Sequence, residues 1–224
     1  EESGEELPGI YSDHSQSPSV YLTGGIGVGR VTKKGLKCPV GYPAINPVPR
    51  QMIAEAARTA LWNLGCERPV YIEIFIPAGR ELALKTFNPR LGIEGGISVL
   101  GTTGIVNPMS EQALIETIRL DIRVQAAENR TLLAVAPGNY GEAFLREEMG
   151  LSMDAFVKCS NFVGETFSML REEGVRQALF AGHLGKLIKV AGGVMNTHSK
   201  YGDRRMEILA DCLAETWNSE EKRS

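Results

Sequence analysis

The feature that most constrains the fold of this sequence is a regular alternation of short apolar runs with longer helix-type segments, which begins near residue 95. The apolar runs predict strands at residues 97–100, 132–136, 155–158 and 178–181. Apolar residues at helical spacing predict helices at residues 110–127, 141–148, 162–173 and 187–191, and a last amphipathic helix around Leu209 and Leu213. Such alternation is typical of a mostly parallel sheet with helices on both faces. We therefore expect residues 95–224 to form one α/β domain.

The sequence before residue 95 has a less regular pattern. Residues 1–18 are rich in Glu, Ser, Gly and Pro, and we expect them to be a mobile lead-in. Residues 19–94 predict an α+β region, with a helix that starts at Asn46-Pro47 and stops at Gly65. Its strands are expected at residues 20–22, 28–31 and 70–76. The glycines between the first two strands lack the Gly-x-Gly-x-x-Gly spacing of a nucleotide site, so a hairpin or bulge is favoured there.

The composition is that of an ordinary soluble globular protein. With 43% hydrophobic and 23% charged residues and a net charge of −3, the chain has no general attraction for nucleic acid or an anionic membrane. It starts at Glu1 rather than Met, in an acidic tract unlike a secretory leader, so we expect a partial or processed chain. Homo-oligomerisation is left open. Reduced thiols and a cytoplasmic location are expected from four widely spaced cysteines, Cys38, Cys66, Cys159 and Cys212.

Polar, glycine-rich loops follow the predicted strands. Because the carboxyl ends of parallel strands lie at one edge of a sheet, we expect these loops to form a ligand site. The first, Gly101-Thr102-Thr103-Gly104, leads to a helix start capped by Ser110, where backbone amides favour an anion; a tight turn without a ligand is the alternative. The second offers Asn139 and Tyr140, which can bind a base or a ribose, or form only a turn and a cap.

The third loop contains Cys159, Ser160 and Asn161. No base adjoins Cys159 in the sequence to activate its thiol, so we do not expect nucleophilic catalysis there. Ser160 and Asn161 are expected to hydrogen-bond a ligand or to cap a helix.

Two further loops carry the histidines and lysines of this edge. His183 and Lys186 stand beside glycines, where they can meet an anionic substrate, although a lone histidine is more often structural. Asn196 and His198 are expected to close over the same cleft. No two histidines and a carboxylate have metal-ligand spacing, so no protein-bound metal is expected.

One group that common nucleotide sites use is missing. An acidic residue usually ends the second strand and binds the ribose hydroxyls, but this sequence has Pro137-Gly138-Asn139 there. The residues alone therefore indicate a small-molecule enzyme with an anion- or nucleotide-binding site, and a small dehydrogenase stays an alternative.

Eight stretches of the sequence follow one another in an order that matches a known family. They are residues 27–32, 34–36, 43–50, 92–104, 107–110, 137–141, 158–162 and 182–198. Together they resemble the CbiD family, the cobalt-precorrin-5B C1-methyltransferases. Members of this family begin with a further segment that has a Gly-Tyr-Thr-Thr-Gly-like motif, which is absent here, so a catalytically silent tetrapyrrole-binding subunit is an alternative.

The resemblance implies a fold, a reaction and a set of contacts. The fold is an α+β part followed by a Rossmann-like, mostly parallel sheet. The reaction is methyl transfer from S-adenosylmethionine to C1 of a cobalt-containing tetrapyrrole, which gives cobalt-precorrin-6A; no catalytic base is assigned. Cofactor contacts are expected at Gly101, Thr102, Thr103, Gly104, Asn139 and Tyr140. Contacts to the carboxylates and polar groups of the tetrapyrrole are expected at Arg50, Ser160, Asn161, His183, Lys186, Asn196 and His198.

Overall fold

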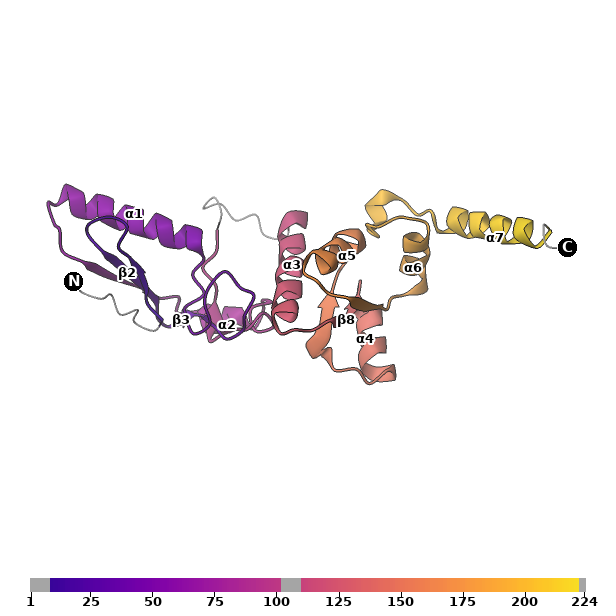
Figure 1. Cartoon of the computed structure of the whole chain (residues 1–224), viewed down its shortest axis with the longest axis horizontal. Coiled ribbons are helices and arrows are strands. Elements are labelled where there is room, and N and C mark those ends of the chain that lie inside the picture. The colour runs from indigo at the N-terminus through magenta and orange to yellow at the C-terminus, as the bar shows by residue number, and fades with distance from the viewer. Residues whose placement is uncertain (1–8, 102–109, 222–224) are drawn as a thin grey trace. The chain divides into compact units, whose positions relative to one another are not determined.

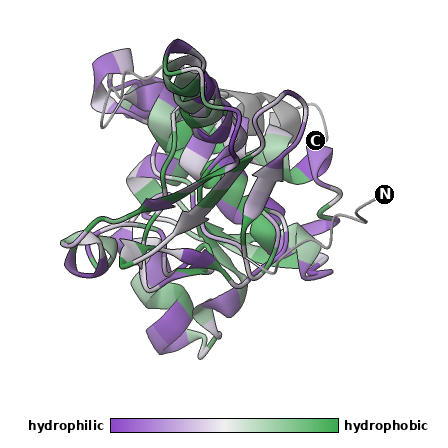
Figure 2. Ribbon diagram, turned by 90° about the vertical axis from the view of Figure 1, so that its left-hand side faces the viewer, coloured by the Kyte–Doolittle hydropathy of each residue, from purple (hydrophilic) through white to green (hydrophobic). Residues whose placement is uncertain are grey.

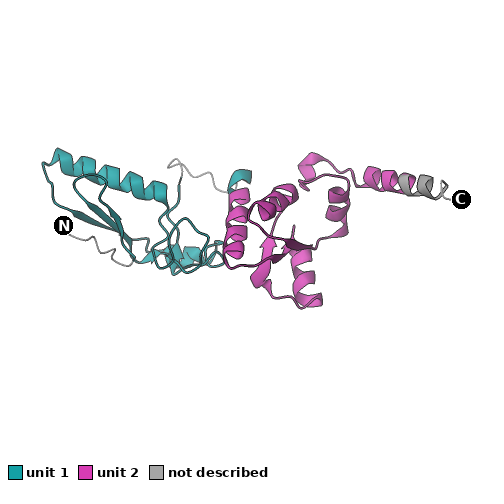
Figure 3. Cartoon of the chain, in the orientation of Figure 1, with its two compact units in different colours: residues 1–113 teal, residues 114–224 magenta. Residues whose placement is uncertain are grey.

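The structure is a computed structural model that describes residues 9–101 and 110–221 (Figure 1). The chain divides into two compact units, residues 1–113 and 114–224 (Figure 3). The helices carry both hydrophilic and hydrophobic residues (Figure 2), as expected for helices that bury one side. In the described part, no helix combines the length and the apolar character needed to cross a membrane.

Unit 1 contains a three-stranded mixed sheet in the order β1-β2-β5. Strand β1 (Tyr11–Asp13) runs antiparallel to β2 (Val20–Gly24), and β5 (Val70–Ile74) runs parallel to β2. Burial alternates along β2, as a strand with one covered face requires: Val20 and Leu22 are buried, whereas Tyr21 and Thr23 are only half-buried.

Helix α1 (Pro47–Asn63) packs against this sheet, and Figure 1 shows it running beside β2. Asn46 is the N-cap residue as predicted, but its side chain does not cap the helix; its Oδ1 accepts the Cys38 thiol instead, at 3.6 Å. The helix ends where Gly65 adopts the left-handed φ of 62°, which agrees with the predicted stop.

The glycine cluster of unit 1 is a place where backbones cross closely. Strand β3 (Gly27–Val28) pairs parallel with β7 (Gly96–Ile97), and β4 (Arg30–Val31) pairs antiparallel with β6 (Ile93–Glu94). A Cβ on Gly79, in the short helix α2 (Gly79–Ala83), or on Gly96 would clash with the Gly27 carbonyl. The predicted hairpin between residues 20–22 and 28–31 is therefore wrong.

Two boundaries also differ from the sequence prediction. Residues 11–13 form the edge strand β1, and Tyr11 is buried with its hydroxyl donating to the Pro43 carbonyl at 2.7 Å, so the expected lead-in contains part of the core. Strands β6 and β7 pair with β4 and β3, so residues 95–101 belong with unit 1. The predicted strand at 97–100 is not in the parallel sheet, because its first residue pairs with β3 instead.

Unit 2 is built on a three-stranded parallel sheet in the order β10-β8-β9. The strands are β8 (Leu132–Ala136), β9 (Phe156–Lys158) and β10 (Gln177–Phe180). The helices α3 (Glu111–Ala127), α5 (Val163–Glu172) and α6 (Leu184–Ala191) are those that the periodicity predicts, with small shifts of their ends. A mixed α/β fold is thereby confirmed.

Strand β8 is buried on both faces. Leu133 and Val135 pack in one core cluster with residues of α3 and α5, while Ala134 and Ala136 pack in another with Leu145. Leu145 lies in a π-helical turn, Phe144–Glu148, which continues the short helix α4 (Asn139–Ala143). The chain therefore leaves β8 toward one face of the sheet and leaves β9 toward the other.

Two short turns and a long helix complete unit 2. They are the 3-10 turns Met153–Ala155 and Ser199–Tyr201 and the last helix α7 (Arg205–Glu221). Helix α7 packs on α6, where the Ile208 side chain occupies the space beside Gly192.

Candidate functional site

Lys186 links the carboxyl ends of the three parallel strands of unit 2. From the first turn of α6, which follows β10, its Nζ donates to the Pro137 carbonyl after β8 at 3.4 Å and to Asn161 Oδ1 after β9 at 2.9 Å. Thr197 joins the same group: its Oγ1 donates to Asn161 Oδ1 at 3.2 Å and its backbone N–H donates to the Asn161 carbonyl at 2.9 Å. The predicted loops after β8, β9 and β10 converge here, and the half-buried Lys186 ammonium lies among them.

Burial changes the acid–base behaviour of this group. Desolvation lowers the pKa of Lys186, and the nearby Cys159 partly opposes that shift. Burial raises the pKa of the Cys159 thiol to about 12. A thiol with such a pKa is protonated at neutral pH, which agrees with the expectation that Cys159 is not a nucleophile.

A second contact fixes the start of α4. Lys158, the last residue of β9, donates to Asn139 Oδ1 and forms an ion pair with Glu142 at 3.0 Å. Sequence reasoning did not single out Lys158 as a site residue; its position at a strand end was the available signal. Tyr140 beside Asn139 is 79% exposed, and its ring centroid is 5.7 Å from that of His183.

Both predicted histidines act as N-caps. His183 Nδ1 accepts the Gly185 N–H at 3.2 Å, and His198 Nδ1 accepts the Lys200 N–H at 3.1 Å. An accepting Nδ1 places the ring proton on Nε2 in a neutral imidazole. Each exposed ring therefore combines a structural contact with one outward N–H donor.

Ser160 and Asn161 do not cap the helix that follows them. The N-cap of α5 is Phe162, and the Asn161 side chain is used by Lys186 and Thr197 instead. Ser160 holds a left-handed φ of 53°, which side chains other than glycine adopt rarely. In the loop that follows α6, Asn196 Oδ1 accepts the His198 backbone N–H at 3.1 Å, so the Asn196 side chain is used within its own loop.

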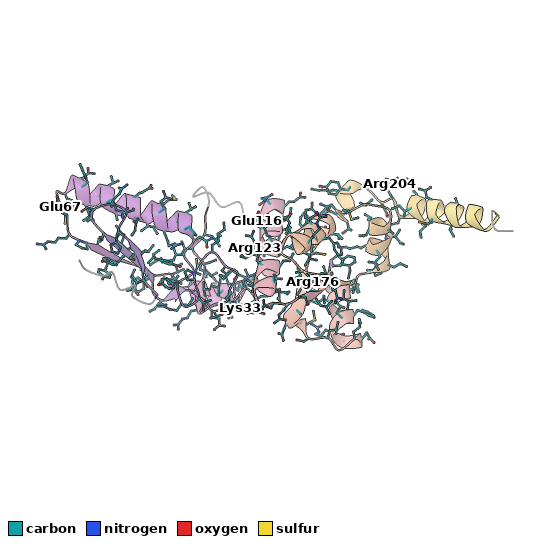
Figure 4. All side chains as sticks on the ribbon, viewed as in Figure 1. Lys33, Glu67, Glu116, Arg123, Arg176 and Arg204 are labelled. Carbon is teal, nitrogen blue, oxygen red and sulfur yellow. The ribbon has the colours of Figure 1, made fainter. Side chains whose placement is uncertain are left out.

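A cavity of about 370 Å³ lies next to Asn196 in unit 2. Its polar wall includes Glu165 and Arg119, whose guanidinium pairs with Glu172 at 2.6 Å. Arg123, labelled in Figure 4, pairs with Glu173 at 2.7 Å and does not line the cavity. Sequence reasoning missed Arg119 and Glu165, because charged residues on helix surfaces are ordinary.

The remaining predicted residues fall in unit 1 or outside the described residues. Thr102, Thr103 and Gly104 lie outside them. Gly101 follows the segment whose Val99 bridges to Ile45, so it does not follow a strand of the parallel sheet as predicted. The predicted cap at the start of α3 is present, with the Ala113 N–H donating to Ser110 Oγ at 3.1 Å.

Arg50 lies in the first turn of α1, with its guanidinium carbon 4.0 Å from the centre of the Tyr11 ring. It lines a cavity of about 240 Å³ within unit 1. Within residues 9–101 and 110–221, no three His, Cys, Asp or Glu side chains are grouped so that they could hold a metal ion.

Comparison with known proteins agrees with the resemblance seen in the sequence. Residues 9–108 match the model of the CbiD family. The chain is 51% identical over 191 residues to a cobalt-precorrin-5B C(1)-methyltransferase of Ruminiclostridium cellulolyticum, an alignment that covers 85% of this chain and 50% of that protein. The protein of the same name from Alkaliphilus metalliredigens is 48% identical over 199 residues, covering 89% of this chain and 52% of the relative.

Among solved structures, the chain is similar to a cobalamin biosynthesis protein (cbiD) from Archaeoglobus fulgidus. The identity is 21% and the TM-score is 0.33, with 82% of this chain and 57% of that chain covered. The chain spans about half the length of the curated relatives that it matches. The predicted family resemblance is confirmed by the family match and these relatives.

Proposed function

Since this chain is a homologue of the CbiD proteins, we propose that it takes part in methyl transfer from S-adenosylmethionine to C1 of cobalt-precorrin-5B, giving cobalt-precorrin-6A in anaerobic cobalamin biosynthesis. The observation that carries the proposal is the 51% identity to a relative that is named for this reaction, over 85% of this chain. The protein is then a C-methyltransferase, and its substrate is a tetrapyrrole with several carboxylates.

The methyl donor fits the edge of the parallel sheet in unit 2. Ligands of open α/β sheets bind where neighbouring strands send their connections to opposite faces, and β8 and β9 do so here. We assign Asn139 and Tyr140 to the donor because the exposed Tyr140 ring can stack on a base and the Asn139 amide can hydrogen-bond it. This arrangement is the Rossmann-like part of the proposed fold. Residues 101–104 of unit 1 stay a proposed further contact.

The tetrapyrrole contacts are assigned by their chemistry. The imidazoles of His183 and His198, whose Nδ1 atoms accept backbone N–H groups, offer Nε2–H donors, and the ammonium of Lys186 offers a positive charge that suits a carboxylate. The polar side chains beside them, Ser160, Asn161 and Asn196, and Arg50 of unit 1 complete the proposed set. Lys186 already donates to two acceptors, so its part in binding is mainly electrostatic.

The proposed reaction depends on positioning. S-adenosylmethionine, when bound, supplies an electrophilic methyl group on a sulfonium. A nucleophilic ring carbon must then lie in line with that methyl group, and water must be excluded, so holding the two substrates matters more than a strong base. In this chain, the loops that Lys186 and Thr197 tie together provide the rigid edge for that purpose.

The test is transfer of label from methyl-labelled S-adenosylmethionine to cobalt-precorrin-5B. The 224-residue chain is assayed beside the full-length Ruminiclostridium cellulolyticum relative as a positive control. Label at C1 with this chain supports the proposal. Tetrapyrrole binding without transfer, while the relative does transfer, overturns it in favour of a catalytically silent binding subunit. Calorimetric binding of nicotinamide dinucleotide and not of S-adenosylhomocysteine points instead to a dehydrogenase.

A further inference from the structure

Arg50 is a half-buried cation whose Nε finds no hydrogen-bond acceptor in the described part of the chain. Its guanidinium lies 4.0 Å over the Tyr11 ring, and its Nε is buried without a hydrogen-bond acceptor. A buried N–H that lacks an acceptor is costly, so each one needs a physical explanation. A bound ligand that accepts this hydrogen bond is one such explanation.

Arg58, two turns further along the same helix, is an arginine of this unit whose guanidinium does have hydrogen-bond acceptors. It donates to the Pro18 carbonyl at 3.2 Å and the Asp13 carbonyl at 3.1 Å, and it pairs with the Asp13 carboxylate at 3.0 Å. Hydrogen bonds from Ser15, and then Arg58, lower the pKa of Asp13. The acid that lines the Arg50 cavity is thus already engaged by other groups, and within residues 9–101 and 110–221 no carboxylate forms an ion pair with Arg50.

The cavity around Arg50 has two kinds of surface. Its floor is apolar, formed by Val20, Leu22 and Ala54, while Ser12 and Gln51 are exposed at its side. The Tyr11 ring is fixed by the hydrogen bond from its hydroxyl to the Pro43 carbonyl at 2.7 Å. Stacking on a fixed ring holds the guanidinium in one orientation before any ligand arrives.

The volume of this cavity, about 240 Å³, limits what it can hold. Sites for whole drug-sized ligands are roughly 300–1,000 Å³, so a tetrapyrrole ring does not fit inside. A short aliphatic arm that ends in a carboxylate does fit: the methylenes contact the apolar floor and the carboxylate meets the guanidinium.

We propose that the Arg50 cavity binds one carboxylate arm, of the acetate or propionate kind, at the edge of the tetrapyrrole substrate. This inference rests on the proposed function, which supplies the polycarboxylate ligand. It adds a separate anchoring pocket in unit 1 that neither the relatives' names nor the sheet edge of unit 2 assigns.

The experiment is a fluorescence titration with the octacarboxylate uroporphyrin, with its octamethyl ester as the uncharged comparison. Arg50→Gln removes the charge and keeps much of the chain length, and the expected result is an affinity lower by about tenfold or more. Arg80→Gln removes an exposed arginine of the same unit as the matched control and is expected to change affinity less than about twofold. Tyr11→Phe keeps the ring but loses the hydrogen bond that fixes it, so the expected fall in affinity is smaller than that of Arg50→Gln.

Several results would overturn the inference. One is equal affinity of Arg50→Gln and the unmodified chain, even if the melting temperature falls, because Arg50 would then be only structural. Another is binding of the ester as tight as that of the acid. Displacement of the porphyrin by millimolar inorganic phosphate but not by propionate would mark a phosphate site instead. This titration measures binding and not methyl transfer. If only the labelling assay fails, the proposed reaction is overturned, but the proposal that the Arg50 cavity binds a carboxylate is not.

Discussion

The two units each contain a three-stranded sheet, but the sheets are buried differently. In unit 2 the sheet is parallel and β8 is covered on both faces, so four consecutive residues, Leu133 to Ala136, are buried. In unit 1 the sheet is mixed, and β5 alternates, with Tyr71 and Glu73 exposed. In unit 2 the covered sheet carries loops at its edge, whereas in unit 1 a cavity lies between α1 and one face of the sheet.

Lys186 and Arg50, the two cations proposed to bind carboxylates, also differ between the units. Lys186 in unit 2 donates to two acceptors from different loops and so helps to assemble the strand ends. Arg50 in unit 1 contacts an aromatic face and has a buried N–H without an acceptor. Lys186 is therefore expected to matter for folding as well as for binding, and Arg50 mainly for binding.

The largest loss of stability is expected from substitutions that shorten buried side chains of the two sheets. Leu133→Ala and Leu22→Ala remove side chains that are 0% and 3% exposed, and each should lower the free energy of unfolding by about 2–5 kcal/mol. Tyr71→Ala, at a residue 64% exposed that stacks on Tyr21, should cost about 0.5–1.5 kcal/mol. Urea unfolding measures all three. A cost for Tyr71→Ala as large as that for Leu133→Ala would show that the outer face of the unit 1 sheet is covered.

A smaller loss of stability is expected from a substitution in the first turn of α4. A Cβ on Gly141 would clash with the Ala181 carbonyl oxygen, so Gly141→Ala should cost about 1–3 kcal/mol by forcing α4 away from the end of β10. Gly138→Ala is the matched control, because its Cβ would meet open space and its extended backbone suits any residue. Thermal unfolding of the two variants tests this, and equal melting temperatures would contradict the close packing of these loops.

The sequence predicted the structure of unit 2 more accurately than that of unit 1. The strand at 132–136 was predicted with its observed ends, because an apolar run between helical segments has few alternatives in an α/β layer. The strand at 97–100 was assigned to the wrong sheet, since a short, mainly apolar run indicates a strand but not its partner. Tyr11 was hidden in a polar tract, where a single aromatic residue gives no periodic signal.

The candidate site was predicted as a set of loops rather than as a set of contacts. Strand-end geometry was enough to bring Asn161 and Lys186 together. It was not enough to show that His183 and His198 cap helices, because a cap depends on local backbone angles. Nor did it reveal the unsatisfied state of Arg50, which depends on which neighbouring acids are already paired.

A still smaller loss of stability is expected from substitution of Lys186. Lys186→Met keeps an unbranched side chain but leaves Asn161 Oδ1 and the Pro137 carbonyl without this donor, so it should cost about 1 kcal/mol. Arg50→Gln loses the contact with the Tyr11 ring but no hydrogen bond from Nε, so it should cost only about 0.5 kcal/mol. The two variants are compared by urea unfolding at neutral pH. A larger loss for Arg50→Gln than for Lys186→Met would reverse the assignment of the two cations.

The smallest effect at neutral pH is expected from the buried thiol beside Lys186. Burial raises the pKa of Cys159 from 9.0 to about 12, so above pH 9.0 the unfolded chain loses this proton while the folded chain keeps it. The unfolded state then binds fewer protons, and the free energy of unfolding falls as the pH rises. The lowered pKa of Lys186 acts in the opposite direction below its ordinary value of 10.5, so it partly masks this loss.

Removing the thiol separates these two contributions. Cys159→Ala should lose the fall in the free energy of unfolding above pH 9.0 and so show only the opposite contribution of Lys186, while Cys212→Ala, at an exposed cysteine, should leave the pH dependence unchanged. Urea midpoints at half-unit steps of pH provide the measurement. If Cys159→Ala keeps the slope of the unmodified chain, the thiol is not desolvated as described, and the strand ends of unit 2 are more open to water than the contacts of Lys186 imply.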